Sequence, residues 1–321
     1  MDKKQLFHTS TTSCIPIKAM LNERLYHSLK NDKQIIPVHL QLSITNACNL
    51  SCAFCSFRDR DKTHELSLDS IMSIIDMFVK LGLQALTITG GGEPLCHPEI
   101  NDILSFCMRR SVKVGLVTNG LLLEKLNRSS FEALTWCRIS FADDRTDDDV
   151  DQIASILSRI CPEAPSVDWS FSYVVLENQN AGIQNRIVSL AKSLGMLNVR
   201  FTPDQNHIEK VDMDFTIKNN GNDDICVYDK KTAGNSLHEC WLYLLKPFIA
   251  ADGYLYPCCC SQYCSDKNDF MMSDRICSYT DFEKKLHEMQ ALHPTCNKCY
   301  LSHYNEFIKA AINTVRHEEW I

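Results

Sequence analysis

The sequence lacks three features that would indicate a membrane, secreted or nucleic-acid-binding protein. No stretch approaches the roughly 20 consecutive apolar residues that a membrane-spanning helix requires. The first 14 residues carry lysines but no apolar core, so they do not predict a secretory signal. The 33 lysines and arginines are outnumbered by 40 aspartates and glutamates, and no basic cluster stands out. We therefore expect a cytoplasmic protein that binds neither membrane nor nucleic acid.

Cysteine, in contrast, is abundant, with 17 in 321 residues. Disulfides are rare in the cytosol, so a cysteine there is usually a small buried residue or a metal ligand. Clustered cysteines favour the second interpretation. They occur here in "CNLSCAFC" (48–55) and in a later segment, 240–299.

Between residues 38 and 204, short β-rich runs alternate with amphipathic segments, which predicts βα units and a parallel sheet. Helical spacing of apolar residues, as in Ile71, Ile74 and Phe78, predicts the helices. The pattern fits an α/β fold, either a partial (βα)6 TIM-like barrel or a doubly wound sheet. Either fold places the functional edge at the C-terminal ends of the strands. The expected strands are 38–45, 85–90, 113–119, 137–141, 169–176 and 198–202.

The loop "CNLSCAFC" follows the first predicted strand and places Cys48, Cys52 and Cys55 at the functional edge. Three thiolates are one ligand short of a structural zinc site or of most iron–sulfur clusters. A zinc half-site is an alternative, with His64 as the nearest histidine after the loop.

A second motif, "TGGGEP" (89–94), ends the second predicted strand at the same edge. Glycines such as Gly91 and Gly92 let a backbone approach a ligand closely, because no Cβ intervenes. Glu93 adds a carboxylate that can accept a hydrogen bond from an ammonium group. A glycine run at a strand end is weak evidence alone, but the pair of motifs is specific.

With these two motifs the chain resembles the radical S-adenosylmethionine (SAM) superfamily across residues 38–204. The matching residues are Cys48, Cys52, Cys55, Gly91, Gly92 and Glu93. The resemblance implies that the three cysteines hold a 4Fe–4S cluster and that SAM is the remaining ligand. Reductive cleavage of SAM then gives a 5′-deoxyadenosyl radical, which abstracts hydrogen from the substrate. The implied electron donor is a flavodoxin or ferredoxin.

The resemblance also implies contacts to SAM. Glu93 and its backbone would hold the methionyl ammonium, and Phe54 would lie against the adenine. Four further residues at strand ends are candidate SAM contacts: Thr118, Asn119, Ser140 and Arg200.

The C-terminal cysteines surround a predicted β-hairpin. The runs "PFIA" and "YLYP" flank "ADG", which predicts a turn at Asp252–Gly253. A hairpin can bring its end cysteines together, and "CNKC" can supply another pair. Four thiolates suit zinc or a 4Fe–4S cluster, and spacing does not choose between them. The segment resembles the twitch domain of some radical SAM enzymes, a shorter relative of the SPASM domain, which implies an auxiliary 4Fe–4S cluster on Cys240, Cys258, Cys296 and Cys299. A one-residue shift would substitute Cys259 for Cys258.

We predict five regions: an N-terminal extension (1–37), the radical SAM partial barrel (38–205), a linker (206–236), a twitch-like domain (237–302) and a C-terminal helix (303–321). The expected reaction is dehydrogenation, epimerisation or a related modification of a peptide, small-molecule or carbohydrate-like natural product. A zinc-stabilised binding protein is an alternative that leaves "GGGEP" without a role. An iron–sulfur electron-transfer protein is another, and it requires four ligands at both sites.

Overall fold

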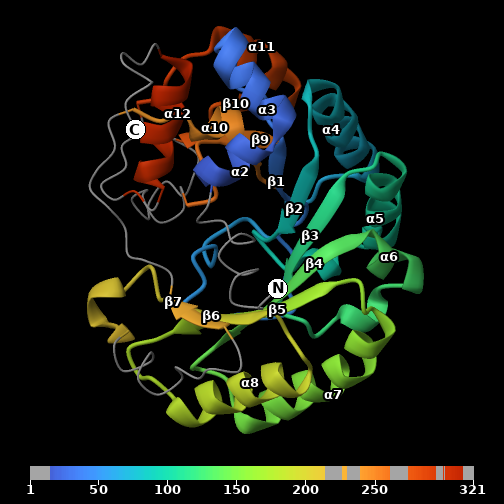
Figure 1. Ribbon diagram of the computed structural model, residues 1–321. Coiled ribbons are helices and arrows are strands. Elements are labelled where there is room, and N and C mark those ends of the chain that lie inside the picture. Colours follow the sequence, from blue (N-terminus) through green and yellow to red (C-terminus); the bar gives the residue numbers. More distant parts are fainter. Residues whose placement is uncertain are drawn as a thin grey trace.

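The structure, a computed structural model, describes residues 15–213, 226–229, 239–260, 274–293, 299 and 301–313. Ten strands within this part of the chain form one sheet, in the order β10-β9-β8-β1-β2-β3-β4-β5-β6-β7. Figure 1 shows that the sheet curves into an open trough, with α4 to α8 along its outer side. The predicted α/β fold, a partial TIM-like barrel followed by a small hairpin, is confirmed.

The six predicted strands are all present and pair in parallel in sequence order. A seventh strand, β7 (Cys226–Asp229), extends the parallel sheet beyond β6 and lies inside the segment predicted as a linker. The region boundaries themselves stay a prediction. The six strands are β1 (His39–Ser43), β2 (Ala85–Thr89), β3 (Lys113–Thr118), β4 (Leu134–Ala142), β5 (Asp168–Val175) and β6 (Asn198–Pro203).

The connecting helices bury the apolar stripes that the sequence predicts. In α4, Ile71, Ile74 and Phe78 are fully buried against the outer face of the sheet. Helix α7 includes Pro162 in its last turn, because proline removes a single amide donor and Ala164 still donates to Ile160 and Cys161. The helices are α4 (Leu68–Leu81), α5 (Ile100–Arg109), α6 (Arg128–Ala133), α7 (Asp147–Glu163) and α8 (Ala181–Ser193).

Side chains alternate along the strands between an apolar outer face and a polar inner face. On β5, Phe171 and Tyr173 belong to the main hydrophobic core, whereas Ser170 and Ser172 point to the opposite face. Parallel strands that are covered on both faces are usually apolar throughout. The polar inner face therefore indicates that the trough encloses a polar lumen.

The C-terminal part adds three short strands to the other edge of the sheet. β8 (Phe248–Ile249) pairs in parallel with β1, and β9 (Tyr254–Tyr256) and β10 (Cys277–Ser278) follow antiparallel. The predicted turn at Asp252–Gly253 is confirmed, with Gly253 at φ +80°. Phe282 of α11 (Phe282–Glu288) stacks on Phe78, with ring centroids 4.7 Å apart, and so joins this part to the barrel.

Further helices pack around these C-terminal strands (Figure 1). The predicted C-terminal helix begins at Ser302, and the N-terminal helical segment is divided into shorter pieces. Across the described ranges, no helix is long and apolar enough to cross a membrane. The helices are α2 (Ile15–Leu21), α3 (Glu23–His27), the π-helix η2 (Ser28–Asp32), α10 (Leu242–Leu245) and α12 (Ser302–Ile312).

Candidate active site

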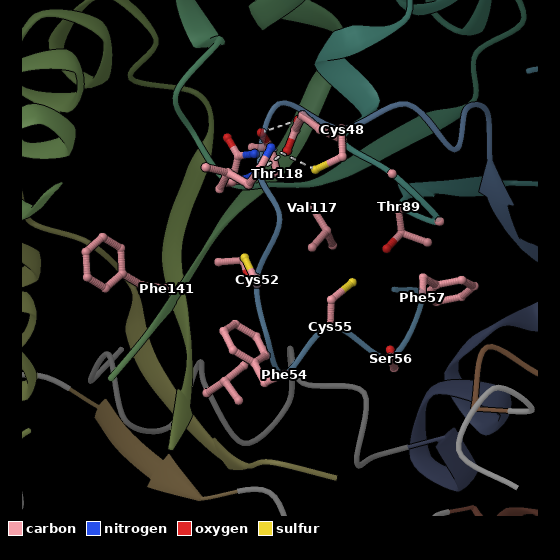
Figure 2. A pocket seen from close by; sticks show the side chains of 18 of the residues that line it. Cys48, Cys52, Phe54, Cys55, Ser56, Phe57, Thr89, Val117, Thr118 and Phe141 are labelled. Carbon is pink, nitrogen blue, oxygen red and sulfur yellow. Dashed lines mark hydrogen bonds between the residues drawn. The ribbon is translucent and has the colours of Figure 1, made fainter. Parts of the chain in front are cut away.

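The three-cysteine loop and the C-terminal strand ends line one cavity of about 270 Å³. Figure 2 shows side chains of the loop and of the ends of β2, β3 and β4 around this space. Arg200 is the only predicted barrel-site residue that is not in the cavity wall; it lies lower on the inner face of β6. The predicted residues that do line the cavity are Cys48, Cys52, Phe54, Cys55, Gly91, Gly92, Glu93, Thr118, Asn119 and Ser140.

Hydrogen bonds hold the cysteine loop at both ends. The amide of Leu50 donates to Cys48 Sγ at 3.4 Å, so the first cysteine turns back on its own backbone. Arg60 donates through Nε to the Asn46 carbonyl at 2.8 Å and through Nη1 to Cys55 Sγ at 3.8 Å. N–H donors directed at sulfur stabilise thiolates and tune the potentials of iron–sulfur clusters.

The glycine motif lies directly against the chain that leads to Cys48. Gly92 donates to the Thr45 carbonyl at 2.9 Å, and Glu93 donates to the Ala47 carbonyl at 2.8 Å. A Cβ at Gly92 would lie 2.0 Å from that Ala47 oxygen, and one at Gly91 would lie 2.0 Å from Asn46 Oδ1. From the sequence, these glycines are expected to let a ligand approach the backbone. In the structure, the segment that leads to Cys48 occupies the space that a Cβ would need.

Glu93 is 3% exposed and its carboxylate is anchored by protein donors. Oε1 accepts from Thr118 Oγ1 at 2.6 Å and from the Leu95 amide at 3.1 Å, and Oε2 accepts from the Asn119 amide at 2.7 Å. Burial raises the pKa of this carboxyl, and these hydrogen bonds act in the opposite direction. One oxygen therefore keeps spare acceptor capacity for a cationic ligand group.

Asn119 connects the end of β3 to the cysteine loop. Its Nδ2 donates to Asn49 Oδ1 at 2.8 Å, next to Cys48. Thr118 accepts from the Gly120 amide at 3.0 Å while it donates to Glu93, so its hydroxyl has a fixed direction. The predicted residues at the end of β3 therefore position the loop and the carboxylate as well as line the cavity.

Several polar residues of the cavity wall are missed by sequence reasoning. The acidic segment "DDRTDDD" (143–149) reads from sequence as a solvated helix start, and this holds for the Thr146–Asp149 capping box of α7. Arg145, however, lines the cavity, and its side chain is only 15% exposed. Burial raises the pKa of the Cys52 thiol, and the Arg145 guanidinium opposes that rise. Three more missed residues lie at the end of β6 or just after it: Thr202, Asp204 and Gln205.

Two atoms of the cavity wall need a partner from outside the protein. Thr202 Oγ1 and Gln205 Oε1 are buried and make no hydrogen bond. Buried polar atoms in native proteins are almost always paired, so unpaired ones beside a cavity indicate a polar ligand. This observation fits a cofactor with many hydrogen-bonding groups.

The three thiols surround a volume and do not converge on a point. Over the described ranges, no three His, Cys, Asp or Glu side chains are grouped to hold a single metal ion. His64 is paired with Asp61 at 3.7 Å and does not line the cavity. Soft thiolates around a cavity fit an iron–sulfur cluster better than a zinc ion with a histidine ligand.

Residues 42–154 match the family model described as the radical SAM superfamily. These residues form a radical SAM domain. The match contains both the cysteine loop and the glycine motif, so the resemblance inferred from those motifs is confirmed.

Two curated relatives match this domain over about 90 residues each. A probable GTP 3',8-cyclase of Methanococcus maripaludis is 38% identical over 88 residues, which are 26% of this chain and 29% of that protein. The subtilosin biosynthesis protein AlbA of Bacillus subtilis is 33% identical over 91 residues, which are 28% of this chain and 20% of AlbA. The matched part is less than a third of either relative.

Solved structures share the fold beyond the radical SAM domain. SuiB of Streptococcus suis, bound to its precursor peptide SuiA, has a TM-score of 0.55 at 15% identity, over 76% of this chain and 64% of SuiB. anSMEcpe, with bound AdoMet and a peptide, has a TM-score of 0.52 at 14% identity, over 88% of this chain and 85% of that chain. At this identity the likeness concerns the fold alone.

Of the four predicted ligands of the auxiliary cluster, Cys240, Cys258 and Cys299 belong to the described part of the chain. Cys296 lies outside the described residues. Cys240 is buried and pairs through its backbone with Leu292 at 2.8 and 2.9 Å. The amide of Cys260 donates to Cys258 Sγ at 3.3 Å, and the amide of Leu301 donates to Cys299 Sγ at 3.4 Å. Cys48 of the radical SAM domain receives the same kind of hydrogen bond.

The hairpin contacts the cysteine loop of the radical SAM domain. A small apolar cluster of Phe248, Ala250 and Tyr256 packs against Cys259 and against Phe57, which lines the cavity. The two cysteine regions are therefore linked by direct packing, and Cys259 takes part in that packing.

Proposed function

We propose that the chain is a radical SAM enzyme in which Cys48, Cys52 and Cys55 hold a 4Fe–4S cluster and SAM occupies the adjoining cavity. When bound, these groups would supply a 5′-deoxyadenosyl radical that removes a hydrogen atom from the substrate. The supporting observation is that one cavity brings together three thiols, a buried glutamate and two unpaired polar atoms.

The protein's own residues would bind and orient the cofactor. The anchored carboxylate of Glu93 would accept from the methionyl ammonium, whose positive charge would compensate the cost of burying the carboxylate. Thr202 Oγ1 and Gln205 Oε1 would gain the hydrogen bonds that they lack. Phe54 lies on the cavity wall, where its ring can cover an adenine.

The segment that follows β6 is also joined to the cysteine loop. Asn206, just after β6, donates through Nδ2 to the Phe54 carbonyl at 3.0 Å and so ties the far edge of the barrel to the cysteine loop.

We also propose that Cys240, Cys258, Cys296 and Cys299 hold an auxiliary 4Fe–4S cluster. The amide–sulfur hydrogen bonds at Cys258 and Cys299 support thiolate character. Four thiolates leave no iron open for substrate, so the proposed role is electron transfer with the barrel site. The packing of Phe57 and Cys259 against the same apolar cluster supports this role, because it joins the two sites.

The proposed substrate is a peptide natural product, modified by dehydrogenation or epimerisation in the cytoplasm with a flavodoxin-type or ferredoxin-type reductant. The relation to AlbA, a bacteriocin biosynthesis protein, supports the peptide class. The relation to probable GTP 3',8-cyclases favours a second candidate, nucleotide cyclisation. A triphosphate needs several cations, whereas Arg145 is the only arginine or lysine among the cavity-lining residues of the described chain.

Anaerobic reconstitution tests both cluster proposals. We expect about eight irons and eight sulfides per chain and the formation of 5′-deoxyadenosine from SAM on reduction. About four irons with intact SAM cleavage would remove the auxiliary cluster. Zinc without iron, or iron without SAM cleavage, would contradict the proposed function.

A further inference from the structure

Below the cavity, the inner face of the sheet lines a polar lumen. Arg200 of β6 lies on this face. Side chains that occupy the same rung of a parallel sheet lie side by side on one face. Ser140 on β4, Ser172 on β5 and Arg200 on β6 share such a rung. Ser140 and Thr202 line the cavity, whereas Arg200 and Ser172 do not; Arg200 precedes Thr202 by two residues on the same face of β6 and so lies one step below the cavity.

Arg200 has fewer partners than a charged group in the interior normally has. Nη2 donates to Ser172 Oγ at 2.8 Å, which is the single hydrogen bond of its guanidinium. Nε is buried without a partner. The side chain as a whole is only partly buried, so the remaining donors can be reached from the lumen.

Six other arginines of the described chain pair with carboxylates, and Arg200 does not. In the described ranges, no carboxylate lies within ion-pair distance of Arg200. The paired arginines are mostly on the surface, where an ion pair contributes little to stability. A guanidinium inside the barrel without a carboxylate partner is therefore the more informative case. Six arginines form such pairs: Arg58, Arg110, Arg145, Arg159, Arg186 and Arg275.

A partly buried guanidinium without a counter-charge is costly, unless a ligand supplies the anion. We propose that Arg200 and Ser172, just below the cavity on the inner face of the sheet, form a subsite that binds a carboxylate of the substrate. This inference rests on the proposed function, since it places the substrate in the lumen next to SAM. It replaces the sequence-based expectation that Arg200 contacts the cofactor.

The surroundings favour a carboxylate, which carries one negative charge, over a phosphate. Arg138, on the inner face of β4, has its guanidinium over the ring of Trp136, 5.0 Å from its centroid. One guanidinium with one serine hydroxyl matches the two oxygens of a carboxylate, which arginine binds in bidentate fashion. A peptide with an aspartate, a glutamate or a free C-terminus would supply this group.

The test uses the anaerobically reconstituted, SAM-loaded chain and the probe N-acetylglutamate α-amide, whose single carboxylate is on the side chain. Its neutral isostere, N-acetylglutamine α-amide, is the matched control ligand. Saturation-transfer NMR measures the affinity of both for the wild type and for Arg200→Gln, Arg200→Lys and Arg128→Gln. Arg128 is exposed on α6 and provides the same change of charge away from the lumen.

We expect Arg200→Gln to weaken binding of the acidic probe at least about tenfold, Arg200→Lys to weaken it less, and Arg128→Gln to leave it unchanged. The neutral probe should bind weakly to all four proteins. Equal affinity of the acidic probe for the wild type and Arg200→Gln would overturn the subsite. Tighter, Arg200-dependent binding of inorganic phosphate would overturn the carboxylate assignment.

Iron content and SAM binding, measured on the same samples, separate this inference from the proposed function. Both should be unchanged in Arg200→Gln, and a selective loss of SAM binding would return Arg200 to the cofactor and overturn the subsite. If the wild type fails to cleave SAM yet binds the probe through Arg200, the proposed function fails and the subsite stands. If Arg200→Gln does not fold, a crystal of the wild type soaked with the probe decides: a carboxylate on the Arg200 guanidinium supports the subsite, and its absence overturns it.

Discussion

The two cysteine regions use the same local contact but are assembled in different ways. Cys48, Cys258 and Cys299 each accept a hydrogen bond from the amide two residues further along. In the barrel, all three predicted ligands belong to a single loop of eight residues. The glycine motif holds the start of this loop through hydrogen bonds to the backbone. In the C-terminal region, the predicted ligands come from residues 240, 258, 296 and 299, far apart in the chain. The barrel site therefore depends on one loop, and the other site on tertiary packing.

The largest effect is expected from a change in the barrel loop, which should remove the barrel cluster and leave the C-terminal cluster in place. Cys52→Ala should abolish formation of 5′-deoxyadenosine and remove about four irons, because a cluster with two protein ligands is not retained. The C-terminal cysteines should keep their own iron. Iron analysis and product chromatography measure both outcomes. Cys107→Ala, a fully buried thiol in α5, is the control and should keep both activities. SAM cleavage by Cys52→Ala would break the assignment of the loop.

The converse change tests the assembled site. Cys258→Ala should remove about four irons and leave cleavage of SAM in place, because the barrel site keeps its own ligands. Cys259→Ala is the matched control, since the neighbouring thiol packs against the apolar cluster of Phe248, Ala250 and Tyr256. We expect Cys259→Ala to retain the full iron content. If the two variants exchange these results, the hairpin ligand is Cys259, and if both keep all iron, the auxiliary site is absent.

The contrast between the regions also explains what the sequence could predict. Six strands, the cysteine loop and Glu93 follow from alternation and short spacings, which are local properties. Arg145 was hidden in an acidic run, because only the structure separates its cavity-facing guanidinium from the solvated start of α7. Thr202 and Gln205 were missed because their position depends on the register of β6, which no motif marks. Gly92 was identified, but its partner, the Ala47 carbonyl, depends on how two loops pack.

The contact between the glycine motif and the cysteine loop leads to a third prediction. Gly92→Ala places a methyl group 2.0 Å from the Ala47 carbonyl oxygen, a backbone atom that cannot turn away. Displacing the loop should cost about 1–3 kcal/mol of stability and reduce the iron bound at Cys48, Cys52 and Cys55. Denaturant unfolding and iron content measure these changes.

Gly195→Ala provides the control for Gly92→Ala. Gly195 has a positive φ of 64°, but a Cβ added there would have no other atom within 4 Å. This variant should lose about 1 kcal/mol and keep its iron. Equal iron content in the two variants would mean that the glycine motif does not position the cysteine loop.

The smallest effect is expected from a change of charge that preserves shape. Glu93→Gln keeps the size of the side chain but directs an amide NH2 toward a donor, either Thr118 or Asn119. It also removes the negative charge available to the SAM ammonium. We expect SAM affinity, measured by equilibrium dialysis, to fall about tenfold with the iron content intact. Glu99→Gln, at the start of α5 and outside the cavity wall, is the control. Loss of iron from Glu93→Gln would instead show that the carboxylate supports the cysteine loop through Asn119 and Asn49, so the barrel site, too, would depend on tertiary contacts.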